Sequence, residues 1–384
     1  MKRAESASID TRRYLGLISG TSMDGVDAVL VEIGHTGLRT LGGLTHRYPL
    51  DLNTTLHRVI APNAQLSLHE IASLNIEVGE CFAQAGNLLL TTLQVAPAAV
   101  TAVGSHGQTL RHAPRAAHPY SIQIGSPAVI AARLGLTTVA DFRSLDIAYG
   151  GEGAPLVPAF HEWLLRQNGE NRVIANIGGI ANISLLPGRS AEPIVGYDTG
   201  PGNCLMDAWC KRHRGLDYDT NGQWAAQGKV SQDLLGLLLS DTYYTAVPPK
   251  STGREVFNLD YLDAELSRGG YANLAGADIQ ATLAELTIET LAREVERSGQ
   301  IFHSKLFICG GGAHNKHLMQ RLATRLASVE IASTSVLDLD PDLVEASAFA
   351  WLAHMRLMNQ PIRMTTGQAD RQVLLGGVYL PTLV

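Results

Sequence analysis

The sequence predicts an α/β protein built from two domains, and three observations lead to this fold class. The chain has 384 residues, whereas a single hydrophobic core stops growing near ~250–300 residues. Hydrophobic residues make up 45% of the chain and charged residues 17%, as is typical of a folded globular protein. Short apolar runs alternate with segments of helical spacing, and several runs end in polar, glycine-containing turns.

In the first part of the chain, two strands joined by a glycine-rich turn, Gly20-Thr21-Ser22-Met23-Asp24-Gly25, come first. Two further strands are expected to end in polar turns, one at residues 105–109 and one at residues 141–143. Ligands of α/β sheets bind at the carboxyl ends of strands, which makes these turns candidates for a site. The predicted strands are residues 15–19, 27–32, 38–50, 98–104 and 137–141, and residues 66–93 have helical spacing.

The second part begins after residues 149–158, a Gly- and Pro-rich stretch that is either a linker or a functional loop. The strand–turn–strand pattern then returns at residues 172–186, with Gly178-Gly179 in the turn. Another strand, 194–197, precedes a polar turn at residues 198–203. Residues 231–300 read as mainly helical, with breaks at residues 248–249 and 269–270. A buried strand at 305–309 leads into Gly310–Gly312, and helices are expected at residues 317–326 and 345–358.

Composition excludes several classes of function. The formal net charge of −6 and the absence of a basic stripe argue against a nucleic-acid partner. No apolar run reaches the ~18–20 residues of a membrane span, and residues 1–13 lack the apolar core of a signal peptide, so we read them as a mobile tail. The four cysteines form no C-x-x-C pair, which suggests neither a zinc site nor a disulfide framework and fits a reducing cytoplasm.

The three glycine-rich turns, at residues 20–25, 178–179 and 310–312, each follow an apolar strand. Phosphate groups are bound by backbone N–H groups and hydroxyls that glycine allows to approach closely. The chain has neither the G-x-x-x-x-G-K-[ST] motif of Walker ATPases nor a G-x-G-x-x-G between a strand and a helix. A Walker ATPase or a Rossmann dehydrogenase is therefore not expected.

Seven motifs, in order along the chain, carry a resemblance to a known family: GTSMDGVD (20–27), SHGQTLRH (105–112), ADFRSLDIAYGGEGAPLVP (140–158), NIGGIANIS (176–184), YDTGPGN (197–203), STGREVFN (251–258) and CGGGAHN (309–315). Together they cover about residues 14–380, and the sequence resembles the anhydro-N-acetylmuramic acid kinase family. That family belongs to the hexokinase–actin–chaperone superfamily of two-domain ATP-dependent proteins.

The resemblance implies an actin-like, ribonuclease H-like ATPase fold with an interdomain cleft. Domain I would hold residues 1–150 plus about 345–384, and domain II residues 151–344. It also implies ATP and Mg²⁺ as cofactors, a homodimer in the cytoplasm, and a small-molecule sugar substrate. The implied enzyme opens the 1,6-anhydro bridge of anhydro-N-acetylmuramic acid with water and phosphorylates the 6-oxygen. The product would be N-acetylmuramic acid 6-phosphate, in bacterial cell-wall recycling and amino-sugar catabolism.

Site residues follow from the same resemblance. Asp198 matches the general base of the family, and Arg143, Glu345 and His106 are expected in the sugar pocket. Asp24 is expected to hold Mg²⁺ through water. The nucleotide contacts are expected from Gly20, Thr21, Ser22, Met23, Asp24, Gly25, Val26 and Asp27 in the first phosphate loop, Asn176, Gly178 and Gly179 in the second, and Gly310, Gly311 and Gly312 in the adenosine loop.

The residues alone allow plainer readings. Asp198 could cap the helix that starts near Asn203 or stabilise its turn. Arg143 could form a surface ion pair with Asp141 or Asp146, and Glu345 could simply favour the N-terminus of its helix. The turn at residues 20–25 could be a hairpin without a ligand, and His106 could have a structural hydrogen-bonding role.

Two other functions remain open from the residues. An actin- or chaperone-like nucleotide switch would use ATP to drive conformation and partner binding. A plain glycosidase with paired carboxylates would need no nucleotide loops.

Overall fold

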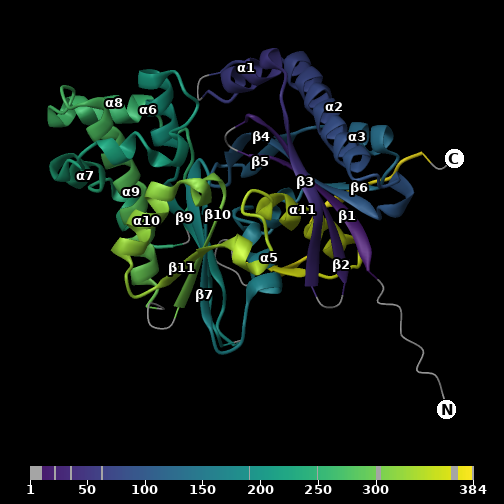
Figure 1. The fold of residues 1–384 in the computed structure, drawn as a ribbon. Coiled ribbons are helices and arrows are strands. Elements are labelled where there is room, and N and C mark those ends of the chain that lie inside the picture. Colours follow the sequence, from purple (N-terminus) through teal and green to yellow (C-terminus); the bar gives the residue numbers. More distant parts are fainter. Residues whose placement is uncertain are drawn as a thin grey trace. The chain divides into compact units, whose positions relative to one another are not determined.

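A computed structural model describes residues 11–20, 23–34, 37–61, 64–189, 191–248, 250–299, 304–364 and 371–382 of the chain. These residues form two compact units (Figure 1). Unit 1 comprises the described residues up to Gly153, then Glu345–Met364, and those from Arg371 onward; unit 2 comprises the described residues of Ala154–Val344. The cleft expected between the two units stays a prediction.

Unit 1 is built on a mixed sheet with strand order β14-β6-β4-β1-β2-β3, and β5 pairs with β4. Strands β1, β2 and β3 form an antiparallel meander, whereas β4 lies parallel to both β1 and β6. The bounds are β1 Arg12–Ser19, β2 Gly25–Gly34, β3 Gly37–Arg47, β4 Ala102–Ala113, β5 Tyr120–Ile124, β6 Thr138–Ala140 and β14 Gly377–Tyr379.

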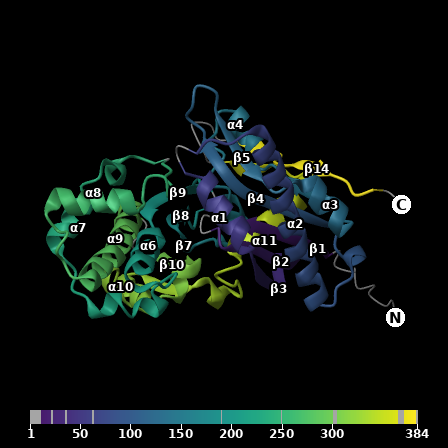
Figure 2. The same cartoon turned by 90° about the horizontal axis from the view of Figure 1, so that it is seen from above.

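Helices cover both faces of this sheet (Figures 1 and 2). Leu15 and Leu17 of β1 share one core with α1 (Leu50–Val59), α2 (Leu68–Thr92) and α3 (Pro127–Leu134). The helix α11 (Val344–Leu357) lies on the opposite face. Gly16, between Leu15 and Leu17, faces this helix, since alternate residues of a strand point to opposite sides. The remaining elements of unit 1 are α4 (Ser144–Ala148) and the two-stranded ribbon of β12 (Ile362–Met364) with β13 (Arg371–Val373).

Two glycines let α11 lie directly on the sheet. Gly16 of β1 and Gly104 of β4 are neighbours in the parallel register. A Cβ atom on Gly16 would stand 1.9 Å from the carbonyl oxygen of Ala346, and one on Gly104 would stand 1.9 Å from that of Phe349. No side chain fits such distances, so the helix backbone contacts the strands only because both positions are glycine.

Unit 2 repeats the plan with a sheet of order β11-β10-β7-β8-β9. One face packs on a core shared with α6, α9 and α10, while Pro158 of α5 contacts the other face at Gly196. The bounds are α5 Val157–Leu165, β7 Asn171–Ile177, β8 Ile180–Leu186, β9 Val195–Pro201, α6 Cys204–Arg214, α7 Gln232–Leu238, α8 Leu259–Gly269, α9 Gly276–Arg297, β10 Ser304–Cys309, α10 Lys316–Arg325 and β11 Glu330–Ser333.

Two expectations about local structure are wrong. Residues 105–109 are not a turn after a strand, because β4 continues from Ala102 to Ala113 and pairs with β5. Asp198 does not follow a strand, because β9 continues to Pro201 and pairs with β8 across a register shift between Ala181 and Asn182. In both cases pairing with a partner strand extends a segment whose glycines read locally as a turn.

In the part of the chain that the structure describes, every helix is too short or too polar to cross a lipid bilayer.

We predict that Gly16→Ala or Gly104→Ala destabilises the protein by about 3 kcal/mol or more, because the new methyl group displaces α11. Urea denaturation measures the loss. Gly236→Ala in α7 is the matched control, since a Cβ there meets no atom within 4 Å, and a helical Gly-to-Ala change stabilises by about 0.5–1 kcal/mol. Equal effects at all three positions would contradict the role assigned to the close contact.

Candidate active site

The turn between β1 and β2 places an acidic side chain at the carboxyl end of β1. The N–H of Met23 donates to the Gly20 carbonyl at 3.2 Å, and the Asn53 amide donates to the Met23 carbonyl at 2.6 Å. These bonds hold Met23, which is buried and has φ +55°, while Asp24 beside it is exposed. Thr21 and Ser22 lie outside the described residues.

Val26 and Asp27 belong to β2 rather than to the turn. Val26 is fully buried, so its side chain has no access to a ligand. The Thr45 hydroxyl of β3 donates to Asp27 Oδ1 at 2.6 Å. Of the two acids, Asp24 is the more exposed to solvent.

The side chains of Arg143 and His106 are hydrogen-bonded to each other in unit 1. Two nitrogens of the Arg143 guanidinium contact His106 Nε2: Nε donates to it at 3.1 Å, and Nη2 lies 2.8 Å from it. The third nitrogen, Nη1, donates to the Gly153 carbonyl at 2.6 Å. Because a guanidinium only donates, His106 Nε2 accepts, and the ring proton lies on Nδ1, 2.9 Å from the Gly107 carbonyl. Burial, together with the Arg143 charge, holds the pKa of His106 well below its usual value.

Glu345 lies beside this pair. Burial raises the pKa of its carboxyl above the ordinary value, and the nearby Arg143 charge opposes part of that rise. One helical turn further along α11, the Phe349 ring packs against His106 with centroids 4.6 Å apart. The structure thus brings together all three residues predicted for the sugar pocket: a cation, a neutral imidazole and a carboxyl group.

The two acids that sequence reading offered to Arg143 each accept a backbone N–H group. The Asp146 carboxylate accepts the Gly153 N–H at 2.7 Å, and Asp141 accepts the Ser144 N–H at 3.3 Å. Glu345 lies in the first turn of α11, where an acid is favoured by the helix dipole. Its helical position and its place beside Arg143 are therefore compatible.

In unit 2 the turn between β7 and β8 is held by the chain that follows β9. The N–H groups of Gly202 and Cys204 donate to the Gly179 carbonyl at 2.9 and 3.0 Å, and that of Asn203 donates to the Gly178 carbonyl at 2.8 Å. The Asn203 side chain adds a bond to the Ile177 carbonyl at 3.0 Å. The turn carbonyls are thus fixed by residues 202–204, which lead into α6.

The glycine triplet after β10 lies against the same turn. Gly310 has φ +75°, and a Cβ there would stand 2.2 Å from Asn176 Oδ1. A Cβ on Gly312 would stand 2.4 Å from the Ile177 side chain. The chain then forms α10, where the Asn315 side chain caps the Leu318 N–H at 3.0 Å. Asn176, Gly178, Gly179 and Gly310–Gly312 therefore gather at the carboxyl ends of β7 and β10.

Asp198 is held from both sides by the segment 250–252. Its N–H donates to the Lys250 carbonyl at 3.1 Å, and its carboxylate oxygen Oδ2 accepts the Thr252 N–H at 3.0 Å. The helix α6 begins after Asn203, so the alternative in which Asp198 caps this helix is wrong. The carboxylate lies instead at a register shift of β9, where a bulged strand re-aims a side chain.

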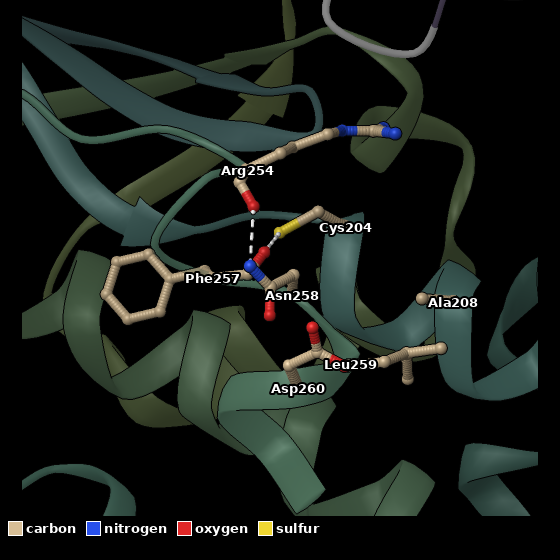
Figure 3. A pocket seen from close by; sticks show the side chains of 7 residues that line it. All are labelled: Cys204, Ala208, Arg254, Phe257, Asn258, Leu259 and Asp260. Atoms are coloured by element: carbon tan, nitrogen blue, oxygen red, sulfur yellow. Dashed lines mark hydrogen bonds between the residues drawn. The ribbon is translucent and has the colours of Figure 1, made fainter. Parts of the chain in front are cut away.

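A cavity of about 320 Å³ lies next to these loops in unit 2 (Figure 3). The Cys204 thiol donates to the Phe257 carbonyl at 3.6 Å, and Asn258 binds the Arg254 carbonyl at 3.1 Å. Burial raises the pKa of Cys204 to about 12, so this thiol is not a nucleophile at neutral pH. The lining residues are Cys204, Ala208, Arg254, Phe257, Asn258, Leu259 and Asp260.

Sequence reading missed several residues of this region. Asn203, Lys250 and Thr252 hold the second turn and Asp198, and none was assigned a role. Arg254 was also missed: its Nε atom is buried and, among the described residues, has no hydrogen-bond partner. Two of the sequence motifs contain three of these residues and could have identified them. Asn203 ends the motif YDTGPGN, and Thr252 and Arg254 belong to STGREVFN.

Comparisons with known proteins agree over nearly the whole chain. The family model described as anhydro-N-acetylmuramic acid kinase matches residues 12–381. The protein of that name from Shewanella oneidensis is 46% identical over 368 residues, which is 95% of this chain and 98% of the relative. Those from Aliivibrio fischeri and Coxiella burnetii are 45% and 44% identical, and each alignment covers 96% of this chain and 99% and 97% of the relative.

We predict that acid destabilises the protein partly through His106. In the unfolded chain His106 binds a proton near pH 6.5, whereas in the folded chain it binds one only at lower pH. The free energy of unfolding therefore decreases as the pH falls below about 6.5. The expected loss is about 1.4 kcal/mol per pH unit for this one group.

The variant His106→Gln keeps an acceptor for Arg143 and removes the titration. Urea midpoints between pH 7.5 and pH 5.5 should therefore fall less in the variant than in the natural protein. Parallel pH profiles for the two proteins would show that His106 binds its proton equally well in the folded and the unfolded chain, which would contradict the prediction.

Proposed function

Because this chain belongs to the anhydro-N-acetylmuramic acid kinase family, we propose that Asp198 is the general base of its reaction. The enzyme is an ATP-dependent phosphotransferase with an alcohol group as acceptor. It opens the 1,6-anhydro ring of anhydro-N-acetylmuramic acid with water and phosphorylates the 6-oxygen, giving N-acetylmuramic acid 6-phosphate and ADP. The observation that carries this function is the family match over residues 12–381.

The chemistry explains why a carboxylate base is needed. A bridging ether oxygen is a poor phosphoryl acceptor until its bond to the anomeric carbon weakens. Asp198 would take a proton from the water that attacks the anomeric carbon, while the electron pair of the breaking C–O bond stays on the 6-oxygen. That oxygen then forms the bond to the γ-phosphorus as the bond to ADP breaks. The Thr252 N–H donates to Oδ2 at 3.0 Å, which fixes the direction in which the carboxylate points.

Arg143, His106 and Glu345 are proposed to hold the sugar. Three bonds to His106 and Gly153 fix the plane of the Arg143 guanidinium, and a fixed fork is suited to a carboxylate such as the lactyl group of muramic acid. Neutral His106 adds no second positive charge. The Glu345 carboxyl, with its raised pKa, is suited to hydrogen bonds with sugar hydroxyls.

The glycine-rich turns are proposed to bind ATP. In unit 1 these residues would be Gly20 to Asp27, with backbone contacts only from the buried Val26. In unit 2 they would be Asn176, Gly178 and Gly179 for phosphate and Gly310–Gly312 for adenosine. The glycines at 310 and 312 leave no room for a Cβ because their backbone packs on Asn176 and Ile177, which brings the triplet close to the proposed second phosphate loop.

Asp24 is proposed to hold Mg²⁺ through water. Among the described residues no group of three or more His, Cys, Asp or Glu side chains could hold a metal ion. Mg²⁺ fits the single exposed carboxylate of Asp24, because it usually keeps several waters and takes one or two carboxylates plus substrate phosphates. When bound, the ion would neutralise charge on the phosphates.

We also propose that the enzyme works in the cytoplasm as a homodimer. All four cysteines are buried free thiols, which supports a reducing compartment, and the family resemblance supports the dimer. Sedimentation equilibrium at micromolar concentration tests the dimer, and a mass equal to one chain would exclude it.

ADP release with and without the sugar tests the function. We expect ADP to appear only with anhydro-N-acetylmuramic acid, in a one-to-one ratio with N-acetylmuramic acid 6-phosphate. ADP release at the same rate with and without the sugar would favour a nucleotide switch. Ring opening without ATP would favour a glycosidase.

We predict that Asp198→Asn lowers kcat by at least ~10³-fold, because the amide cannot take the proton from water. Calorimetry should show ATP binding within about twofold of the natural protein, since the variant keeps the backbone bonds of β9. A variant with near-natural kcat would overturn the assignment of the base.

We predict that Arg143→Lys raises KM for the sugar by about 10–100-fold and leaves KM for ATP unchanged, because an ammonium group cannot replace a planar fork. Arg133→Lys is the matched control, since Arg133 also forms a fork, with Glu80, but on the surface. If KM for ATP rose instead, Arg143 would belong to the nucleotide site.

A further inference from the structure

Lys250 is a buried cation whose partner is a buried anion. Its Nζ atom lies 2.8 Å from Glu294 Oε1, and the two side chains are only 4% and 5% exposed. Replacing such a pair by apolar residues is often neutral or stabilising, because desolvation of the two charges offsets their attraction. Stability alone is therefore a weak reason for the pair, and its neighbours indicate another one.

The pair belongs to a closed ring of contacts around Asp198. Lys250 Nζ donates to the Tyr243 carbonyl at 3.3 Å and lies 4.8 Å from the centre of the Tyr243 ring. The Tyr243 hydroxyl donates to the Asp198 carbonyl at 2.7 Å. The Asp198 N–H returns to the Lys250 carbonyl at 3.1 Å. The N–H and carbonyl groups of Asp198 are thus both hydrogen-bonded, one to Lys250 itself and the other to Tyr243, which Lys250 contacts.

Glu294 extends this ring to the residue before Asp198. The Tyr197 hydroxyl donates to Glu294 Oε2 at 3.1 Å. Burial and the Glu294 charge raise the pKa of Tyr197 to about 12, so it remains a donor at neutral pH. One carboxylate of α9 therefore fixes the Lys250 ammonium and the Tyr197 side chain together.

We propose that Lys250 is a positioning residue for Asp198: its ammonium, set by Glu294 and Tyr243, fixes the segment 250–252 that binds the Asp198 backbone and carboxylate. The proposal rests on the proposed function, in which Asp198 is the base. Lys250 touches no reacting atom. It acts through the Thr252 N–H and the Lys250 carbonyl, which fix the direction in which the Asp198 carboxylate points. A base misplaced by about 1 Å loses on the order of 10²-fold in rate.

The test compares Lys250→Met with the natural enzyme. Methionine keeps most of the length of the side chain and removes the ammonium. We expect kcat to fall by about 10–100-fold, while KM for ATP and for anhydro-N-acetylmuramic acid stays within about twofold, because neither ligand is bound by Lys250. Lys305→Met is the matched control: Lys305 pairs with Glu170 at 3.1 Å in the same unit but is 37% exposed, and kcat should not change.

A second variant separates positioning from folding. Lys250→Met removes the buried cation of Glu294, which keeps the exposed Arg297 at 2.6 Å, and we expect the thermal midpoint to fall. The double variant Lys250→Met/Glu294→Met removes both charges, so its midpoint should return toward that of the natural protein, whereas kcat should stay low. A double variant with natural kcat would overturn the proposal, as would a single variant in which KM rises and kcat does not change.

These outcomes are distinct from a failure of the proposed function. If Asp198→Asn keeps its activity, Asp198 is not the base, whatever Lys250 does. If Asp198→Asn is inactive and both Lys250 variants are fully active, the base assignment stands and only the positioning role fails.

Discussion

The contact between α11 and the sheet of unit 1 is the constraint on which the arrangement of Arg143, His106 and Glu345 depends. At Gly16 and Gly104 the helix backbone takes the volume that two side chains would otherwise fill. This contact sets the distance of α11 from β4 and, with it, the place of Phe349 beside His106 and of Glu345 near Arg143. The Arg143 guanidinium then takes its orientation from His106. A side chain at either glycine would displace α11 and with it Glu345 and Phe349.

Unit 2 uses the same principle at its loops. Gly310 and Gly312 lie on Asn176 and Ile177, and Gly202 lies on the Gly178 carbonyl, with no room for a Cβ at any of the three. Backbone groups therefore form the surface around both turns. Asp198, the proposed base, is held differently: hydrogen bonds from a distant segment of the chain fix the direction of its carboxylate.

The sequence was sufficient for most elements and for the family, but not for the contacts that orient the site. The strands at 15–19, 172–186 and 305–309 were predicted because apolar runs and flanking glycines are local signals. Strand β4 was cut short at Ser105, since its extension depends on pairing with β5. The bond of Arg143 to His106 spans 37 residues, and that of Lys250 to Glu294 spans 44. Periodicity carries no information about such pairs, and the motif STGREVFN marked a region without indicating its partner.

The discontinuity of unit 1 has a consequence for synthesis on the ribosome. The first 153 residues leave the ribosome long before Glu345–Met364, with the described residues of unit 2 between them. At about 5–20 residues per second, the interval is roughly 10–40 s. During it, one face of the nascent sheet, including Gly16 and Gly104, lacks the helix that covers it. All strands of the unit 2 sheet are synthesised within this interval, so that sheet can form before α11 covers the sheet of unit 1.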